Sequence, residues 1–412
     1  MSYWQSKGVQ AKILSISGIS NQRTKQLLDL PQADLSDAIL SRLPETQRIE
    51  FSLRGGLVFR AIQAKRSGLR FGKTCLAIYS KMSTSQERLT AHRFPEKAAD
   101  VLVDFMEDYS LQNADEIIPH SCGKNLLTFV QNPSPSENPF VTVVVPHFNL
   151  GDYLPAALAS LAQQDYPAYE VIVIDDGSTE PSSLETFRAL RGLYSSFRFL
   201  EQSNRGIGAT RNRGLNLASG EYYLPFDADN IAHPKMISCF VQAMRRQPET
   251  AALTCYFEAF ARDEDLAAGR FLYSVRPTGG PFVLAASQNI YGDACALYRT
   301  EILRKIGGFG EERETSFEDW ELFVRMRGLG LQVDVVPAVL FWYRHRKSGF
   351  SRVTNGFANQ QRVLRAFAQA TQLPAQEREW LTQVLAGMEQ HRQMRQSRSL
   401  RQRMWAWMKG CD

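Results

Sequence analysis

Two aspartates, Asp227 and Asp229, stand one residue apart at the end of the apolar stretch EYYLPF. Side chains two residues apart in an extended chain point to the same side, so the two carboxylates repel each other. A divalent cation would relieve this repulsion, because Mg²⁺ and Mn²⁺ take oxygen ligands and keep positions free for phosphate oxygens. The pair therefore indicates a metal site for a diphosphate, with a solvated turn as the plainer alternative.

A second acidic pair, Asp175 and Asp176, ends the apolar stretch YEVIVI and is followed by Gly-Ser-Thr. A carboxylate in this place can accept hydrogen bonds from a ribose or a base. The stretch NRGIGATRNRG, residues 204–214, contains glycines that let the backbone approach a ligand, and Arg211 can face a phosphate. Arg211 stands where a dinucleotide fingerprint has its third glycine, which disfavours a nicotinamide cofactor.

These residues can act together only if secondary-structure elements bring them to one place. Apolar runs alternate with helical patterns from residue 140 to residue 230. An alternation of strands and helices at short spacing predicts an α/β domain with a mainly parallel sheet. Ligands bind at the carboxyl ends of such strands, so three polar clusters would meet at one edge. The predicted strands are FVTVVVPHFN, YEVIVIDDGST, FRFLEQS and EYYLPFDADN.

The N-terminal third has a different pattern. Residues 47–82 are rich in β-formers with Gly-Gly and Ser-Gly breaks, which predicts three strands in a meander. Residues 95–111 begin with proline and have apolar residues at helical spacing, which predicts a helix. We therefore expect a small accessory α+β domain over 1–130, without recognisable chemistry. The stretch QNPSPSENP at 131–139 predicts a linker.

The C-terminal region, residues 356–412, reads as a helical extension. Its last segment carries Trp405 and Trp407 among arginines and a lysine over 395–409. A basic helix with tryptophans can lie on an anionic membrane surface. The alternative is a terminal helix that packs its tryptophans on the protein, so peripheral membrane contact and the oligomeric state stay open.

Composition limits the class of protein. The chain has 412 residues, which predicts two or three domains, and 44% hydrophobic and 22% charged residues are typical of a globular protein. The net charge of +5 comes from basic residues interleaved with acids, which argues against nucleic-acid binding. The six cysteines form no CxxC pair, which disfavours zinc. Without a signal peptide or a long apolar run, we expect a cytoplasmic protein.

Three segments together resemble glycosyltransferase family 2, the large inverting family with the GT-A fold. They are VTVVVPHFNLGDYLPAALASLAQQDYPAYEVIVIDDGSTEPS, NRGIGATRNRGLNLASGEYYLPFDADN and GDACALYRTEILRKIGGFGEERETSFEDWELFVRMRGLG. The resemblance covers roughly 139–355, a little over half of the chain. It implies a GT-A domain over 140–355, a mainly parallel sheet flanked by helices, between the accessory domain and the helical tail.

The resemblance also implies roles for matching positions. Asp229 is the implied direct metal ligand, with Asp227 and His345 beside it, and Mn²⁺ or Mg²⁺ is the implied cofactor. Asp319 in FEDWEL is the implied catalytic base, next to Glu318. The positions expected to bind the nucleotide sugar are Pro146, Phe148, Asn149, Asp176, Arg211, Asn212, Asp227, Asp293 and Arg346.

One loop departs from the family pattern. In WYRHRKSGFSR, His345 sits one position early and Arg346 takes its usual place. The third metal ligand is therefore in doubt. Binding of the diphosphate by Arg346, Lys347 or Arg352 is an alternative for this loop.

The two acidic motifs match the chemistry of an inverting transfer. A single in-line displacement needs a base to take the acceptor proton and a cation to stabilise the departing nucleoside diphosphate. For FEDWEL the plainer alternative is a set of acids that favours a helix N-terminus. The sequence predicts transfer from a nucleotide sugar, expected to be a UDP-sugar, to a hydroxyl of a glycan or lipid-linked acceptor. Such transfers build cell-surface polysaccharide or lipopolysaccharide.

Two rival functions stay open. The first is a non-catalytic carbohydrate-binding or scaffold protein on a transferase fold, against which the complete acidic motifs argue. The second is a polymerase with a further centre in 1–130, where no second set of acidic motifs occurs. For the favoured function we expect a location in the cytoplasm, with peripheral contact at the inner face of the membrane.

Overall fold

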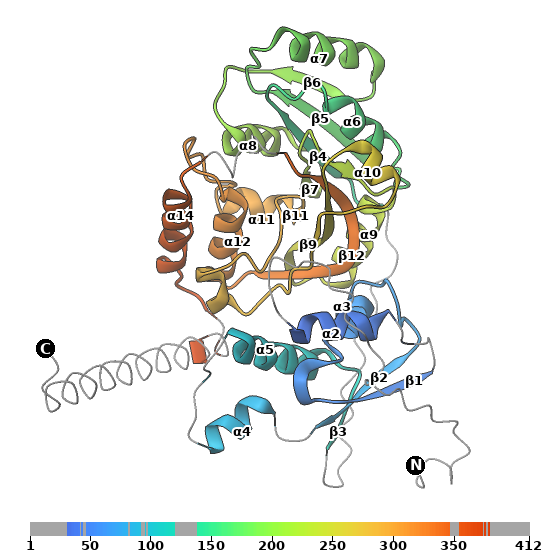
Figure 1. Cartoon of the computed structure of the whole chain (residues 1–412), viewed down its shortest axis with the longest axis vertical. Coiled ribbons are helices and arrows are strands. Elements are labelled where there is room, and N and C mark those ends of the chain that lie inside the picture. Colours follow the sequence, from blue (N-terminus) through green and yellow to red (C-terminus); the bar gives the residue numbers. More distant parts are fainter. Residues whose placement is uncertain are drawn as a thin grey trace, which may run out of the picture.

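A computed structural model describes residues 31–41, 43, 47–80, 83–91, 95, 98–119, 138–346, 354–373, 375 and 378–379. Figure 1 shows a larger unit built around a nine-stranded sheet and a smaller unit built around a three-stranded sheet. Most of the predicted linker and the whole basic tail at 395–409 lie outside the described residues. The domain boundaries therefore stay a prediction. Within the described residues, no helix has the length and apolar character needed to cross a membrane.

One half of the large sheet is parallel, as the alternating pattern predicts. Strand β4 lies in its middle, and every one of its residues is buried. Val143 and Val145 belong to one hydrophobic core, whereas Val144 belongs to the core on the opposite face. The strands of this half, in spatial order, are β6 (Arg198–Glu201), β5 (Tyr169–Asp175), β4 (Val141–His147) and β7 (Tyr222–Pro225).

The other half of the large sheet is mixed. The short β11 (Leu297–Arg299) runs antiparallel to β7 and to β9 (Thr250–Phe260), and β9 pairs in parallel with the long β12 (Gln332–Arg344). Two further strands, β8 (Ile231–Ala232) and β10 (Tyr273–Val275), pair antiparallel with β12 and β9. The α/β class is thus confirmed, with antiparallel pairs confined to this half.

Helices cover both faces of the sheet, because each parallel connection needs a crossover. Their polar N-terminal ends matter most for the site, since α8 and α12 both begin near the carboxyl end of β7. The helices of the larger unit used below are α7 (Pro181–Leu193), α8 (Ile207–Leu217), α9 (Met236–Arg246), α12 (Glu318–Gly328) and α14 (Gly356–Ala368).

The smaller unit corrects one prediction. Its strands β1 (Arg48–Ser52), β2 (Cys75–Ser80) and β3 (Glu116–Pro119) are parallel, so the predicted meander is wrong. Helix α3 (Phe59–Arg66) occupies the place of the middle predicted strand. Gly55 and Gly56 both have positive φ and form a tight turn that leads into this helix. The helix predicted at 95–111 is confirmed as α5 (Ala98–Asn113).

Candidate functional site

Arg211 is the centre of the site. It lies on α8, and its side chain is 1% exposed. One terminal nitrogen donates to Asp227 Oδ1 at 2.7 Å and the other to Glu318 Oε1 at 2.6 Å. The guanidinium also lies over the ring of Phe309, 5.3 Å from its centroid. Arg211 therefore joins the carboxyl end of β7 to the start of α12, and these contacts occupy both of its terminal nitrogens.

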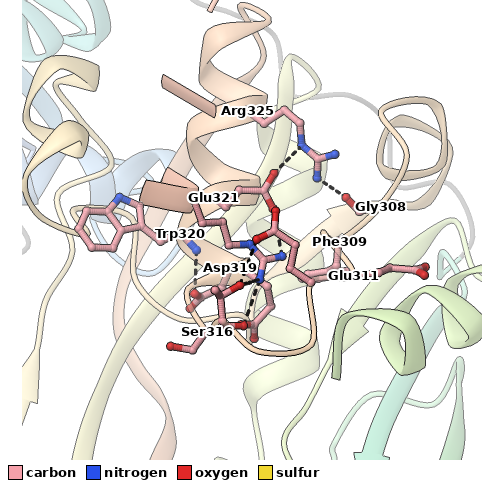
Figure 2. A network of polar contacts seen from close by, with 12 residues as sticks. Gly308, Phe309, Glu311, Ser316, Asp319, Trp320, Glu321 and Arg325 are labelled. Carbon is pink, nitrogen blue, oxygen red and sulfur yellow. Dashed lines mark hydrogen bonds and ion pairs between the residues drawn. The ribbon is translucent and has the colours of Figure 1, made fainter. Parts of the chain in front are cut away.

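Asp319 occupies the first turn of α12. Its Oδ1 accepts a hydrogen bond from the Trp320 backbone N–H at 2.7 Å, a contact shown in Figure 2. Burial and the neighbouring Glu318 carboxylate raise the pKa of Asp319 to about 7, while Arg211 opposes the increase. A carboxylate with such a pKa can accept a proton near neutral pH.

Asp293 is the fourth acid of this group. Its Oδ1 accepts a hydrogen bond from the Cys295 N–H at 2.9 Å. Burial raises the pKa of Asp293 well above its usual value, and the charges of Asp227 and Asp319 raise it further. These mutual effects show that the structure brings Asp227, Asp293 and Asp319 together, although they lie on three separate segments.

Asp229 lies at the same strand end and is 8% exposed. Burial raises its pKa and the Asp227 carboxylate raises it further, so the two acids repel each other as the sequence predicts. Arg346 Nε donates to Asp229 Oδ2 at 2.5 Å, and Arg344 Nε donates to its backbone oxygen at 3.0 Å. Arg346 is thus placed directly beside the predicted metal ligand.

The two aspartates have the chemistry that a hard cation requires, namely carboxylate oxygens under mutual repulsion, with Asp229 buried and Asp227 half-buried. Within the described ranges, however, no three or more His, Cys, Asp or Glu side chains gather as a set of metal ligands. His345 packs its ring against Tyr273, with Nδ1 at 3.2 Å from the phenol oxygen. The role of His345 as a third ligand therefore stays a prediction.

Asp176 is buried at the end of β5, and both of its carboxylate oxygens accept hydrogen bonds from the protein. Its Oδ1 accepts from the side chain of Gln202 at 2.7 Å and from the Arg205 N–H at 2.8 Å, and Oδ2 accepts from the Gly206 N–H at 2.8 Å. These bonds hold the loop before α8. A ligand that reaches Asp176 must share or replace them.

Residues at the end of β4 hold a second loop of the site. Pro146 belongs to the strand, and Phe148 is 43% exposed just beyond it. Asn149 has a φ of +51°, and its Oδ1 accepts from the N–H groups of Thr179 and Glu180. Asn149 therefore fixes the loop between β5 and α7, and the exposed ring of Phe148 is left beside that loop.

Asn212 also acts on a loop. Its side chain donates to Phe309 O and accepts from Phe309 N–H, both at 2.8 Å. Gly308 has a φ of +68°, and a Cβ there would lie 2.3 Å from Asn212 Oδ1. Figure 2 shows Arg325 at the same loop, where it donates to Gly308 O and pairs with Glu321.

Sequence reasoning missed several residues that position the site. Gln202 donates to the Asp176 carboxylate, and Arg325 donates to the backbone oxygen of Gly308. Trp320 links Asp319 to another segment through the bond from its indole N–H to Ala285 O at 2.9 Å. A contact between a side chain and a distant backbone oxygen leaves no spacing signal in a single sequence. Of these three residues, only Trp320 lies within a recognised motif, directly after the acidic pair of FEDWEL.

Comparison with known proteins identifies the class of the larger unit. The sequence profile described as Glycosyl transferase family 2 matches residues 142–307. This segment contains β4–β7, Arg211, both aspartates of the pair and Asp293. It therefore belongs to glycosyltransferase family 2, as its motifs suggested.

Curated relatives agree with this assignment. Glycosyltransferase GlyA of Streptococcus pneumoniae is 27% identical over 236 residues, which are 52% of this chain and 32% of the relative. The uncharacterized glycosyltransferase YibD of Escherichia coli is 38% identical over 96 residues, 23% of this chain and 28% of the relative. The matches thus span about a third of each relative's length.

Solved structures are similar at low identity. TarS of S. aureus, residues 1–349 in complex with UDP-GlcNAc, gives a TM-score of 0.47 at 19% identity, covering 60% of this chain and 72% of that one. The mannosyltransferase PcManGT of Pyrobaculum calidifontis, in complex with GDP-Man and Mn²⁺, gives 0.44 at 20% identity, with coverage of 68% and 86%.

Proposed function

We propose that the chain is a glycosyltransferase that moves a sugar from a nucleotide sugar to an acceptor hydroxyl. The observation that carries the proposal is the acid cluster of Asp227, Asp229, Asp293 and Asp319, built around Arg211 at the carboxyl edge of the sheet. This edge is where ligands bind in α/β sheets. Family membership of residues 142–307 supports the same reaction class.

In this proposal Asp319 is the base of a single in-line displacement. The acceptor O–H gives its proton to an Asp319 carboxylate oxygen while the acceptor oxygen forms a bond to the anomeric carbon. The bond from that carbon to the phosphate oxygen breaks, and the nucleoside diphosphate leaves with the electron pair. The raised pKa of Asp319, about 7, fits a base that works near neutral pH.

Asp227 and Asp229 would hold Mn²⁺ or Mg²⁺, with phosphate oxygens and water as the remaining ligands. The metal supplies positive charge that stabilises the departing diphosphate. Arg346 is bonded to Asp229 Oδ2. In the proposal it moves toward the diphosphate when the metal binds to that carboxylate. His345 stays a candidate for a third ligand.

The nucleoside would lie over the ends of β4 and β5, beside Phe148, Asn149 and Asp176. The backbone around Gly206 can approach the ligand because this residue has a φ of +90°. We revise the expected role of Arg211. Since both of its terminal nitrogens are bonded to carboxylates, Arg211 positions Asp227 and Glu318 rather than binding phosphate. Asn212 likewise positions the loop at 308–311.

The donor in this proposal is a UDP-sugar, and the acceptor is a glycan or a lipid-linked glycan. Both follow from the family resemblance. Asp293 lies close enough to Asp227 and Asp319 for their charges to raise its pKa, and in this proposal it would contact the transferred sugar. Within the described residues of the smaller unit, no three or more His, Cys, Asp or Glu side chains gather as a set of metal ligands, so one catalytic centre is proposed.

The decisive test replaces the base. Asp319→Asn should lower transfer by about 10²–10⁴-fold, because the substitution removes the proton acceptor. UDP binding, measured by calorimetry with Mn²⁺, should stay within twofold of the unchanged protein. Glu312→Gln is the matched control, since Glu312 lies seven positions earlier and pairs with Arg365 at the surface.

The alternative is a non-catalytic carbohydrate-binding protein on the same fold. It would bind donor with the same affinity in all three proteins and release no UDP from any of them. Transfer by Asp319→Asn at the rate of the unchanged protein would refute Asp319 as the base.

A further inference from the structure

One segment, residues 276–293, runs from the smaller unit to the acid cluster. It follows β10 and ends at Asp293, and residues 277–285 are all buried. The smaller unit contacts its first part, and the catalytic acids lie at its far end. Side chains and backbone groups make the contacts at both ends.

At the first end, Arg60 of α3 holds the backbone of the segment. This arginine is 0% exposed, and it donates to Pro277 O at 2.9 Å and to Arg276 O at 3.2 Å. Its charge is balanced by Asp37, whose carboxylate lies 3.6 Å from Nε. A buried arginine bonded to two consecutive backbone oxygens fixes the course of the chain at that point.

Two neighbours of Arg60 strengthen this contact. Gln63, one turn along α3, donates to Thr278 O at 3.4 Å and to Asp334 Oδ1 at 3.2 Å. On α5, the ring of Phe105 packs so closely against Gly280 that a Cβ there would lie 2.5 Å from it. The smaller unit therefore holds three consecutive residues, 276–278, and then the glycine at 280.

The held part of the segment is bonded directly to the part that carries Asp293. The N–H groups of Thr278 and Gly279 both donate to Ile290 O at 3.0 Å. The Pro277 ring lies against Gly292, where a Cβ would be 3.2 Å from Pro277 Cγ. Gly292 has a φ of +113°, which other residues rarely adopt, and it is followed by Asp293.

The middle of the segment reaches the base. Ala285 O accepts the indole N–H of Trp320 at 2.9 Å, and the Trp320 backbone N–H donates to Asp319 Oδ1 at 2.7 Å. The segment thus contacts the surroundings of Asp293 at its end and of Asp319 at its middle. Both acids belong to the cluster described above.

We propose that Arg60 is a positioning residue for the transfer reaction, and that the smaller unit acts by holding residues 276–293 so that Asp293 and Asp319 face the transferred sugar. The proposal rests on the proposed function for its catalytic part. It assigns the N-terminal unit a task within the site itself. Arg60 touches neither donor nor acceptor and acts through the backbone of the segment.

The first test is amide hydrogen exchange on the full chain. Arg60→Gln should raise exchange at Thr278, Gly279, Gly292 and Cys295 by at least about tenfold, because these amides lose the support that keeps them bonded. Amides of β4 and β5 should exchange as before. Arg54→Gln is the control, since Arg54 is on the same unit but 74% exposed and paired with Glu87 at the surface.

The second test is kinetic and uses a UDP-sugar that the unchanged protein turns over. Arg60→Gln should lower kcat by about 10–100-fold, because a displaced catalytic group costs that much. The KM for the donor should stay within twofold, since the proposed nucleoside pocket at β4 and β5 is not contacted by the segment. A merely destabilised protein would lose kcat in proportion to its unfolded fraction, and the loss would vanish at lower temperature.

Gly280→Ala covers the case in which Arg60→Gln does not fold. The added methyl group would push the segment from Phe105 while every contact of Arg60 keeps its chemistry. The same exchange and kcat changes are expected. Unchanged exchange at 278–295 in the variant that folds would overturn the proposal, and so would raised exchange with unchanged kcat. If no nucleotide sugar is turned over by the unchanged protein, the proposed function fails, and exchange alone still decides whether Arg60 holds the segment.

Discussion

Two regions of buried charge in the described part of the chain are built on opposite principles. At the contact between the smaller unit and the sheet, Arg60 faces Asp37, and Arg66 faces Asp334, so acids and bases balance. At the carboxyl edge of the sheet, five acids (Asp227, Asp229, Asp293, Glu318 and Asp319) accompany Arg211 and Arg346.

Under the proposed function, the difference separates charges that serve stability from charges that serve chemistry. A balanced buried network fixes how two surfaces meet, because each charge has a partner within the protein. An excess of buried acids raises their pKa values and leaves negative charge that a metal ion or a proton can neutralise. The acid cluster is therefore destabilising as it stands and suited to a metal-bound diphosphate and a proton transfer.

The largest effect is expected where the two principles meet, at Arg211. Arg211→Met should lower the free energy of unfolding by about 3–5 kcal/mol, because the half-buried Asp227 and the buried Glu318 would lose their common counter-charge. Chemical denaturation checks this. Arg213→Met on the same helix is the control, since Arg213 bonds Glu201 O and Gln202 near the surface. Equal losses of stability in both variants would mean that the ion pairs of Arg211 contribute nothing beyond its place in the helix.

A second substitution, Asp319→Asn, should raise the free energy of unfolding rather than lower it. The pKa of Asp319 is raised in the folded state to about 7, so its protonated form is favoured by folding. The stability that this gives is fully present below the unfolded pKa of about 4 and is lost as the pH rises through 7. Asp319→Asn should therefore stabilise the metal-free protein at pH 8 by on the order of 1–3 kcal/mol and have little effect at pH 4.

The same pKa predicts how the rate depends on pH. Transfer needs the deprotonated base, so kcat should rise through about pH 7 and level off above it. Denaturant melts and initial rates from pH 5 to pH 9 test both statements. If Asp319→Asn were less stable at pH 8 than the unchanged protein, the Asp319 carboxylate would have to be well solvated or paired.

The smallest effect is expected in the balanced network. Tyr109→Phe removes the bond from the phenol to Asp334 Oδ2 at 2.7 Å, while Gln63 still donates to Oδ1 of the same carboxylate. The expected loss is about 1 kcal/mol in the free energy of unfolding. Tyr79→Phe is the control, because its phenol bonds Glu50 at the surface. A loss of several kcal/mol at Tyr109 would mean that this network is as unbalanced as the site.

Sequence reasoning reached the larger unit better than the smaller one, for a physical reason. Strands β4 and β5 are buried on both faces, and their continuous apolar runs have few other interpretations. In the smaller unit, the stretch FRAIQAKR has β-formers but folds as α3, since its buried face packs against β12 and the neighbouring helix. Tertiary contacts decided the structure of that stretch.

The site shows the same limit. The motifs predicted that acids would lie at the carboxyl edge of the sheet. The structure brings these acids, Asp227, Asp229 and Asp319, together. The spacing could not tell that Arg211 would be bonded to Asp227 and Glu318, nor that Asp176 would be occupied by Gln202 and two backbone groups. Such partners come from distant segments, so only the fold reveals them.

The central claim is that the acid excess holds a metal with a nucleoside diphosphate, and thermal unfolding tests it directly. UDP and UDP-sugars would be added with Mn²⁺, with Mg²⁺ or with a chelator, to the unchanged protein and to Asp229→Ala. A ligand present at about 100 times its Kd stabilises the native state by about 2.7 kcal/mol. The account predicts a rise in Tm that needs metal and disappears in Asp229→Ala. A folded protein whose Tm responds to no nucleotide, with or without metal, would contradict it.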